Sequence, residues 1–237
     1  MAADQFPGGR HGGGQLTKRQ SNYIKLVAIA AMFVDHAGLL LFPGTVFFRI
    51  AGRISFPLFA YQIGVSYEHT RSFKKYILKL LLCALIFQGF YFAAQWVDAS
   101  VDPGYLNIFF TLALGLFLIW LADRRRYLLA AGSLALPVLA SGAGLTVDYG
   151  VYGAAMILFL YLLKNKPFWT IFYLGASTFL YCFFAPGGSF LQMYCLLAAV
   201  CLFKPLSLRR NIPGWFFYGF YPSHLLLLYG IRELLTR

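Results

Sequence analysis

The stretch that decides the fold is Val27-Ala-Ile-Ala-Ala-Met-Phe-Val-Asp35-His36-Ala37, an apolar run that ends in an acid and an imidazole. A second stretch, Arg49-Ile-Ala-Gly-Arg53-Ile-Ser-Phe-Pro57, follows it and carries two guanidinium groups. An ionisable side chain deep in a hydrophobic span is costly unless it faces protein, water or an opposite charge. The two stretches therefore predict a functional centre inside a helical hairpin.

Composition places the chain among membrane proteins. It has 237 residues, of which 60% are hydrophobic and 12% charged, whereas a soluble domain carries about 25% charged residues. The apolar blocks are long enough to cross roughly 30 Å of hydrocarbon, and we predict an all-α polytopic integral membrane protein with about nine transmembrane helices. The expected spans are residues 24–42, 47–66, 76–96, 105–122, 127–143, 148–163, 168–184, 189–203 and 215–234.

The N-terminal segment differs from the rest in composition. Residues 1–22 are rich in glycine and hold no apolar run, so they predict a disordered Gly-rich tail. A cleavable signal peptide is not expected, because no short apolar core with a small-residue cleavage site follows a basic start. We expect residues 23–237 to form a single transmembrane helical domain.

The net charge of +12 indicates orientation in a membrane better than it indicates nucleic-acid binding. Basic residues lie before or at the start of the first span, and in every second loop after it or at the edge of the adjoining span: Arg10, Lys18, Arg19, Lys25, Arg71, Lys74, Lys75, Lys79, Arg124, Arg125, Arg126, Lys164, Lys166, Lys204, Arg209 and Arg210. The intervening loops contain no basic residue. Because positive loops stay inside, the N-terminus is expected in the cytoplasm, and an odd span count puts the C-terminus outside.

Depth in the membrane relates the polar residues of different spans. At about 1.5 Å per residue, His36 lies roughly 18 Å and Arg53 roughly 21 Å from the cytoplasmic edge. His224 lies roughly 14 Å from the same edge by this rise, and Asn107 and Asp148 lie near the outer ends of their spans. The five residues could therefore share one site in the middle and outer membrane.

The cysteines do not suggest a metal site or a disulfide framework. All of them fall within apolar spans and show no close spacing, namely Cys83, Cys182, Cys195 and Cys201. Such cysteines are typical of small core residues. We expect no metal.

Several motifs together resemble those of the TraX family. They are Lys25-x₆-Met32-x₂-Asp35-His36, Gly52-Arg53-Ile-Ser-Phe-Pro-Leu-Phe-Ala60 with Gly64, Asn107-Ile-Phe-Phe-Thr-Leu-Ala-Leu-Gly115, Asp148-Tyr-Gly-Val-Tyr-Gly153 and Phe220-Tyr-Pro-Ser-His-Leu225. The resemblance runs in order from about residue 22 to residue 230. The Asp-His pair and the Gly-Arg-x-Ser/Ala-Phe-Pro block are its most specific parts.

The resemblance implies an activity that composition does not. The family's named activity is acetylation of the N-terminal amine of a conjugative pilin, with acetyl-CoA as co-substrate, and the family resembles broader transmembrane acyltransferases. It implies a multi-pass acyltransferase of the bacterial cytoplasmic (inner) membrane. Its expected partners are the lipid bilayer and an acyl acceptor that is a pilin, a peptide or a glycan. The oligomeric state and the acyl chain length stay open.

Acyl transfer needs a base, a group that stabilises the oxyanion, and alignment of two substrates. We predict His36 as the general base, with Asp35 paired to Arg53 or to Arg49. A rival assignment makes Arg53 the oxyanion or acyl-donor contact. Further candidates for substrate binding are Arg49, Asn107, Asp148 and His224. Candidates for contact with the phosphates of CoA are Lys25, Lys74, Lys75 and Lys79, which could equally serve only as orientation signals.

Two other function classes stay open. In a transporter or channel, Asp35, His36 and Arg53 would form a proton or substrate relay. No repeated half with broken helices in matching positions is visible, which weakens that alternative. A third possibility is a non-catalytic assembly partner of a secretion or pilus machine.

Overall fold

The computed structural model describes residues 16–95, 102, 104–184, 189–208 and 212–236. Contacts divide the chain into two compact units. Unit 1 comprises Met1–Gln62 and Asn165–Arg237, and unit 2 comprises Ile63–Lys164. A single domain over residues 23–237 stays a prediction.

Helix α1 (Lys18–Leu40) opens unit 1 with a reciprocal cap. The Thr17 hydroxyl accepts a hydrogen bond from the Gln20 backbone amide at 3.2 Å, and the Gln20 side chain accepts one from the Thr17 amide at 2.9 Å. This capping box satisfies amides that a helix start would leave unpaired. The tail predicted over residues 1–22 therefore ends too late, because α1 already begins at Lys18; residues 1–15 lie outside the described residues.

The span predicted over residues 47–66 is broken into α2 (Val46–Gly52) and α3 (Ser55–His69). Pro57 has no amide hydrogen, and its ring clashes with the carbonyl four residues earlier, which belongs to Arg53. The helix therefore breaks at Arg53 and resumes at Ser55, whose hydroxyl donates to the Ala28 carbonyl of α1 at 3.0 Å.

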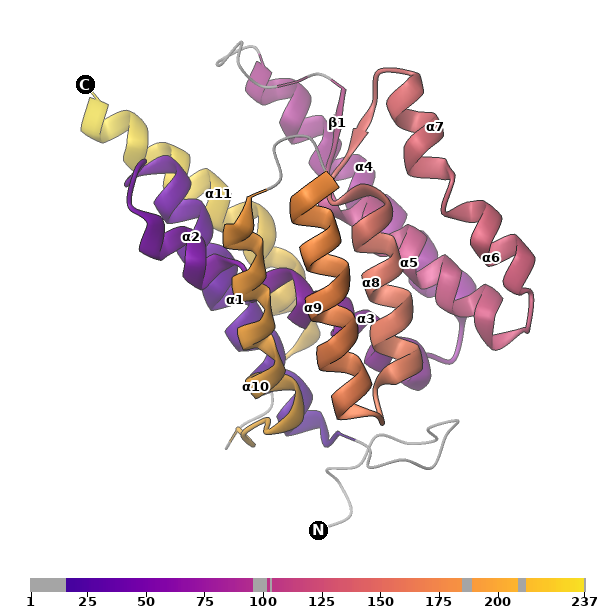
Figure 1. Cartoon of the computed structure of the whole chain (residues 1–237). Helices are drawn as coiled ribbons and strands as arrows, with labels where there is room; N and C mark the ends of the chain where they lie inside the picture. The colour runs from indigo at the N-terminus through magenta and orange to yellow at the C-terminus, as the bar shows by residue number, and fades with distance from the viewer. Residues whose placement is uncertain (1–15, 96–101, 103, 185–188, 209–211, 237) are drawn as a thin grey trace. The chain divides into compact units, whose positions relative to one another are not determined.

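Helices α1 and α2 form a tight antiparallel hairpin (Figure 1). Two glycines allow the close approach. A Cβ atom placed on Gly38 would lie 2.3 Å from the Phe48 Cβ, and one placed on Gly52 would lie 2.3 Å from the Asp35 Cβ. Real carbon atoms sit about 3.5–4.0 Å apart, so neither position accepts a larger residue without separating the helices.

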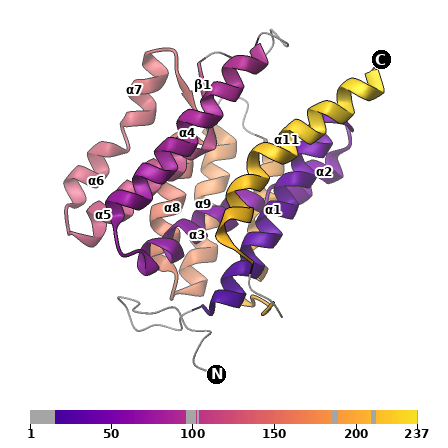
Figure 2. The same cartoon turned by 180° about the vertical axis from the view of Figure 1, so that it is seen from behind.

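Helix α11 (Gly214–Thr236) lies beside α1 and runs in the same direction (Figure 2). The order of contacts shows the direction: Lys25 lies over the Phe217 ring, and three turns later His36 meets His224. The count of nine spans and the cytoplasmic N-terminus stay predictions.

The rest of unit 1 is α9 (Pro167–Phe184), the 3₁₀ helix η2 (Phe190–Leu197) and α10 (Ala198–Phe203). The predicted span over residues 189–203 is therefore 3₁₀ for its first half. Gln192, Cys195 and Ala198 are all buried, at the spacing of three residues that a 3₁₀ helix requires for one face.

Unit 2 continues α3 into a set of helices around two short strands. Its elements are α4 (Phe73–Gln95), β1 (Tyr105–Leu106), α5 (Ile108–Asp123), α6 (Tyr127–Ser133), α7 (Leu136–Gly142), β2 (Thr146–Val147) and α8 (Gly150–Leu163). The strands pair in parallel, with Tyr105 opposite Thr146. The span predicted over residues 127–143 is two short helices, and Pro137 stands in the first turn of the second.

The helical membrane character of the chain is confirmed at a coarse level. Within the described ranges, three helices are long and apolar enough to cross a membrane, namely Lys18–Leu40, Phe73–Phe92 and Pro167–Phe184. Shorter apolar helices accompany them, among them Ile108–Asp123 and Gly150–Leu163. The all-α prediction is therefore correct apart from the two-residue strands.

Candidate functional site

A carboxylate held by two guanidinium groups forms the charged centre of unit 1. Arg49 Nη1 lies 2.8 Å from Asp35 Oδ2, and Arg53 Nη2 lies 3.2 Å from Asp35 Oδ1. The sequence predicted that Asp35 pairs with Arg53 or with Arg49, and the structure pairs it with both. The side chains of Asp35 and Arg53 are 18% and 17% exposed, whereas that of Arg49 is 33% exposed, so Arg49 is the more open partner.

Gly52 makes this arrangement possible. It ends α2 directly opposite Asp35, and any side chain there would overlap the carboxylate, with a Cβ only 2.2 Å from Asp35 Oδ1. Because Gly52 has no side chain, the Asp35 carboxylate can reach the guanidinium groups of Arg49 and Arg53.

Arg53 is fixed by three hydrogen bonds. Its Nε donates to the Arg49 carbonyl at 3.2 Å, its Nη1 donates to Gln192 Oε1 at 2.9 Å, and its Nη2 donates to Asp35. A guanidinium carries five N–H donors, so two remain for other contacts. These contacts make Arg53 a link between α1, α2 and η2. Its rival role as the oxyanion contact stays a prediction.

Gln192 is the member of this centre that sequence reasoning missed. Its side chain is buried and accepts a hydrogen bond from Arg53. Its sequence signal is an uncharged amide inside the apolar run of residues 190–197, which indicates a site less strongly than an ionisable group does.

His36 and His224 form a hydrogen-bonded pair, with 2.8 Å between His36 Nδ1 and His224 Nε2. His224 Nδ1 lies 2.9 Å from the Phe220 carbonyl, which only accepts, so Nδ1 carries the hydrogen. Neutral His224 must then accept at Nε2, and His36 must donate from Nδ1. The hydrogen-bond network therefore leaves the lone pair of His36 on Nε2.

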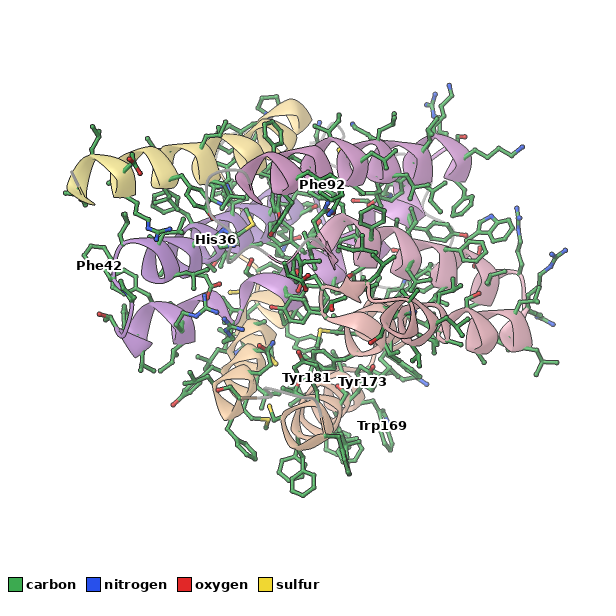
Figure 3. The ribbon with its side chains drawn as sticks, turned by 90° about the horizontal axis from the view of Figure 1, so that it is seen from above. His36, Phe42, Phe92, Trp169, Tyr173 and Tyr181 are labelled. Carbon is green, nitrogen blue, oxygen red and sulfur yellow. The ribbon has the colours of Figure 1, made fainter. Side chains whose placement is uncertain are left out.

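Aromatic rings hold His224 in place. The Phe220 ring stacks on it at 5.0 Å between centroids, and the Phe33 ring lies 6.4 Å away. His224 is only 2% exposed, while His36 is partly exposed. Figure 3 shows His36 on α1. His36, the more exposed residue of the two, is thus the one whose Nε2 lone pair is free.

Asn107 and Asp148 lie in unit 2, so a shared site with His36 stays a prediction. Asn107 caps α5 by accepting from the Phe109 amide, and its own amide donates to the Ala84 carbonyl and to Gln88. These bonds use both hydrogens of the Asn107 amide and account for its burial. The Asp148 carbonyl accepts from the Thr111 hydroxyl, which joins the start of α8 to α5.

The lysines fall into two groups. Lys25 is partly buried, and its ammonium lies 5.6 Å from the centre of the Phe217 ring. Lys74, Lys75 and Lys79 are exposed on the first turns of α4 in unit 2. Their role in CoA binding stays a prediction. Among the residues that the structure describes, no three His, Cys, Asp or Glu side chains gather as a metal ion would need.

Comparisons with known proteins cover almost the whole chain. A family described as "TraX protein" matches residues 20–232. The chain is 29% identical over 235 residues to the "Probable fimbrial assembly protein FimC, serogroup H1" of Dichelobacter nodosus, covering 90% of this chain and 95% of that protein.

A second similarity is partial. The chain is 36% identical over 55 residues to the "Uncharacterized protein RP591" of Rickettsia prowazekii (strain Madrid E), which is 22% of each chain. No solved structure matches the chain. The match of the family over residues 20–232 spans both units and every motif quoted above, and the chain therefore belongs to the TraX family.

Proposed function

We propose that this chain is an integral membrane acyltransferase that moves an acetyl group from acetyl-CoA to an amine or hydroxyl of an extracytoplasmic acceptor. The observation that carries the proposal is the His36–His224 pair, because it leaves a lone pair on Nε2 of His36, a partly exposed residue, and this lone pair can take a proton. Membership of the TraX family supports the same reaction class, since the resemblance of the motifs to that family implies acetylation of a pilin.

In the proposed reaction, the lone pair of the acceptor amine or hydroxyl attacks the thioester carbon. The acceptor's proton passes to His36 Nε2, and the carbonyl electron pair moves onto oxygen. When the tetrahedral intermediate collapses, the C–S bond breaks and CoA leaves as a thiolate, which takes the proton from His36. His36 can become charged without losing its bond to His224, because it donates from Nδ1 in both states.

The Asp35–Arg49–Arg53 cluster supplies the positive charge that stabilises the oxyanion in the proposed reaction. One carboxylate and two guanidinium groups leave a net charge of +1 beside His36 in the sequence. A fixed positive charge in a water-poor site stabilises a developing oxyanion more than it would in water. The bond from Arg49 Nη1 to the Asp35 carbonyl, at 3.4 Å, also ties α2 to the backbone that carries His36.

The acceptor is proposed from the relative's name. The relative is named a probable fimbrial assembly protein, and fimbriae are built from pilin subunits, so an exported pilin-like chain with a free N-terminal amine is the first acceptor to test. CoA would approach from the cytoplasm, where Lys25 and the exposed Lys74, Lys75 and Lys79 could attract its phosphates.

Purified full-length protein in proteoliposomes tests the proposal. Acetyl-CoA and a peptide with a free N-terminal amine are added, and free CoA and acetylated peptide are measured by mass spectrometry. The protein should form both in equal amounts, and His36→Gln should form neither while remaining folded. CoA release by His36→Gln at the unmodified rate would contradict the assignment of the base.

One observation favours a second candidate function. Two hydrogen-bonded imidazoles can pass a proton between them, as a proton-coupled transporter requires. The same proteoliposomes distinguish the two functions, because proton flux without loss of the thioester would support transport.

A further inference from the structure

One polar group in the charged centre, the Gln192 side-chain NH₂, makes no hydrogen bond within the part of the chain that the structure describes. The Gln192 Nε2 atom is fully buried and has no hydrogen-bond partner among the described residues. A buried donor left unpaired costs free energy, because it has given up its hydrogen bonds to water and gained none in return. Native structures rarely carry such groups without a reason, and a group that awaits a ligand is one such reason.

The surroundings of Gln192 orient this donor. Its Oε1 accepts a hydrogen bond from Arg53 Nη1 at 2.9 Å. The Nε2 atom, at the other end of the amide, therefore points away from the guanidinium. Its backbone amide donates to the Ser189 carbonyl at 2.9 Å. A donor whose amide oxygen already binds a cation is polarised, so its N–H groups become stronger donors.

The backbone under Gln192 is unusual as well. η2 runs for eight residues as a 3₁₀ helix, whereas 3₁₀ runs longer than about four residues are uncommon and often mark strained or functional segments. η2 packs against both α2 and α9. Gln192 therefore reaches the charged centre from a third helix, in addition to α1, which carries Asp35, and α2, which carries Arg49.

We infer that the Gln192 side-chain amide donates a hydrogen bond to the acyl carbonyl oxygen of the substrate, and that Arg53 positions it to do so. This inference rests on the proposed acyl transfer. The amide gains no proton and loses none: it binds the carbonyl oxygen of the thioester and binds it more strongly when attack turns that oxygen into an oxyanion. Removing one such donor typically lowers kcat by about 10²–10³.

The alternative is that Gln192 only anchors Arg53, and one substitution separates the two roles. Gln192→Glu keeps the length of the side chain and its acceptor, and adds a charge that attracts Arg53. An anchoring role would survive this change, whereas a donor role would be lost.

Gln62 gives a matched control, since it is a second buried glutamine with an unpartnered Nε2, and its Oε1 accepts from Ser21. Ser21 lies roughly 21 Å from Asp35 along α1 at 1.5 Å per residue.

The test uses acetyl-CoA labelled with ¹³C at the thioester carbonyl, bound to full-length His36→Gln protein, which holds the thioester without turning it over. The infrared frequency of the bound carbonyl should be lower than that of free acetyl-CoA. This shift should disappear in His36→Gln/Gln192→Glu and persist in His36→Gln/Gln62→Glu. In the otherwise unmodified protein, Gln192→Glu should lower kcat about 100-fold, as expected for one lost donor.

The possible results are distinct. A shifted carbonyl band that Gln192→Glu leaves unchanged would overturn the role of Gln192 and leave the acyltransferase proposal standing. Absence of any bound thioester band in all three proteins would overturn both. A normal kcat in Gln192→Glu would likewise assign Gln192 to anchoring alone.

Discussion

The close approach of α1 and α2 predicts a large effect from a single methyl group. In Gly52→Ala, the new Cβ would lie 2.3 Å from the Asp35 Cβ and 2.2 Å from Asp35 Oδ1. The Asp35 Cβ is fixed to the backbone of α1, so rotation of the carboxylate cannot relieve the overlap. Carbon atoms need about 3.5 Å, and the helices must therefore separate by about 1 Å.

This separation would lengthen the contact between Arg49 and Asp35 from 2.8 Å to about 4 Å, beyond hydrogen-bonding distance. A displacement of about 1 Å in an active site can cost about 100-fold in rate. Overpacking costs about 1–3 kcal/mol of stability. Gly52→Ala should thus fold with a lower melting temperature and lose about 99% of its activity.

The assay compares the rate of acetylated peptide formation with the thermal unfolding of the same samples in detergent. Gly89→Ala is the control, because a Cβ on Gly89 in α4 meets nothing within 4 Å. It should keep both the activity and the stability. If Gly52→Ala retained normal activity and an unchanged melting temperature, the tight hairpin and the role given to Asp35 would both be wrong.

Further predictions concern the base, the cluster and unit 2. His36→Ala should lower kcat by about 10²–10⁴ through loss of the base, while His224→Ala should cause a smaller loss, because it removes only the partner that fixes the His36 tautomer. Arg53→Gln should destabilise the protein by about 3 kcal/mol and Arg49→Gln by about 1 kcal/mol or less, as expected for a buried and a more exposed partner of one carboxylate; thermal unfolding of both variants measures the difference. Gly115→Ala should lower the melting temperature, since its Cβ would lie 2.4 Å from Ile157 Cδ1, and an unchanged melting temperature would contradict the packing of α5 on α8.

The sequence predicted the helical class and the pairing of Asp35 for a simple physical reason. Charge inside an apolar span must be neutralised, and the apolar segment that follows Asp35 carries opposite charges at Arg49 and Arg53. The predicted segments also coincide broadly with helices, because apolar runs of membrane length are a strong signal.

What the sequence could not supply depends on contacts between distant segments. The meeting of His36 with His224 joins residues 188 positions apart, and no periodicity within α1 or α11 contains that information. Gln192 was missed because an uncharged amide is a weak signal inside an apolar run. The break at Arg53 is different, because it is local: Pro57 indicates a kink in this span from the sequence alone, since its ring blocks the carbonyl four residues before it.

The central claim is that His36 is the base of an acetyl transfer across the membrane. Its most direct test loads proteoliposomes so that ¹³C-labelled acetyl-CoA is on one side and an amine-bearing peptide on the other. Labelled peptide should accumulate with the unmodified protein and be absent with His36→Ala at equal folded amounts. Equal labelling by both proteins would contradict the account, as would intact acetyl-CoA accompanied by proton flux.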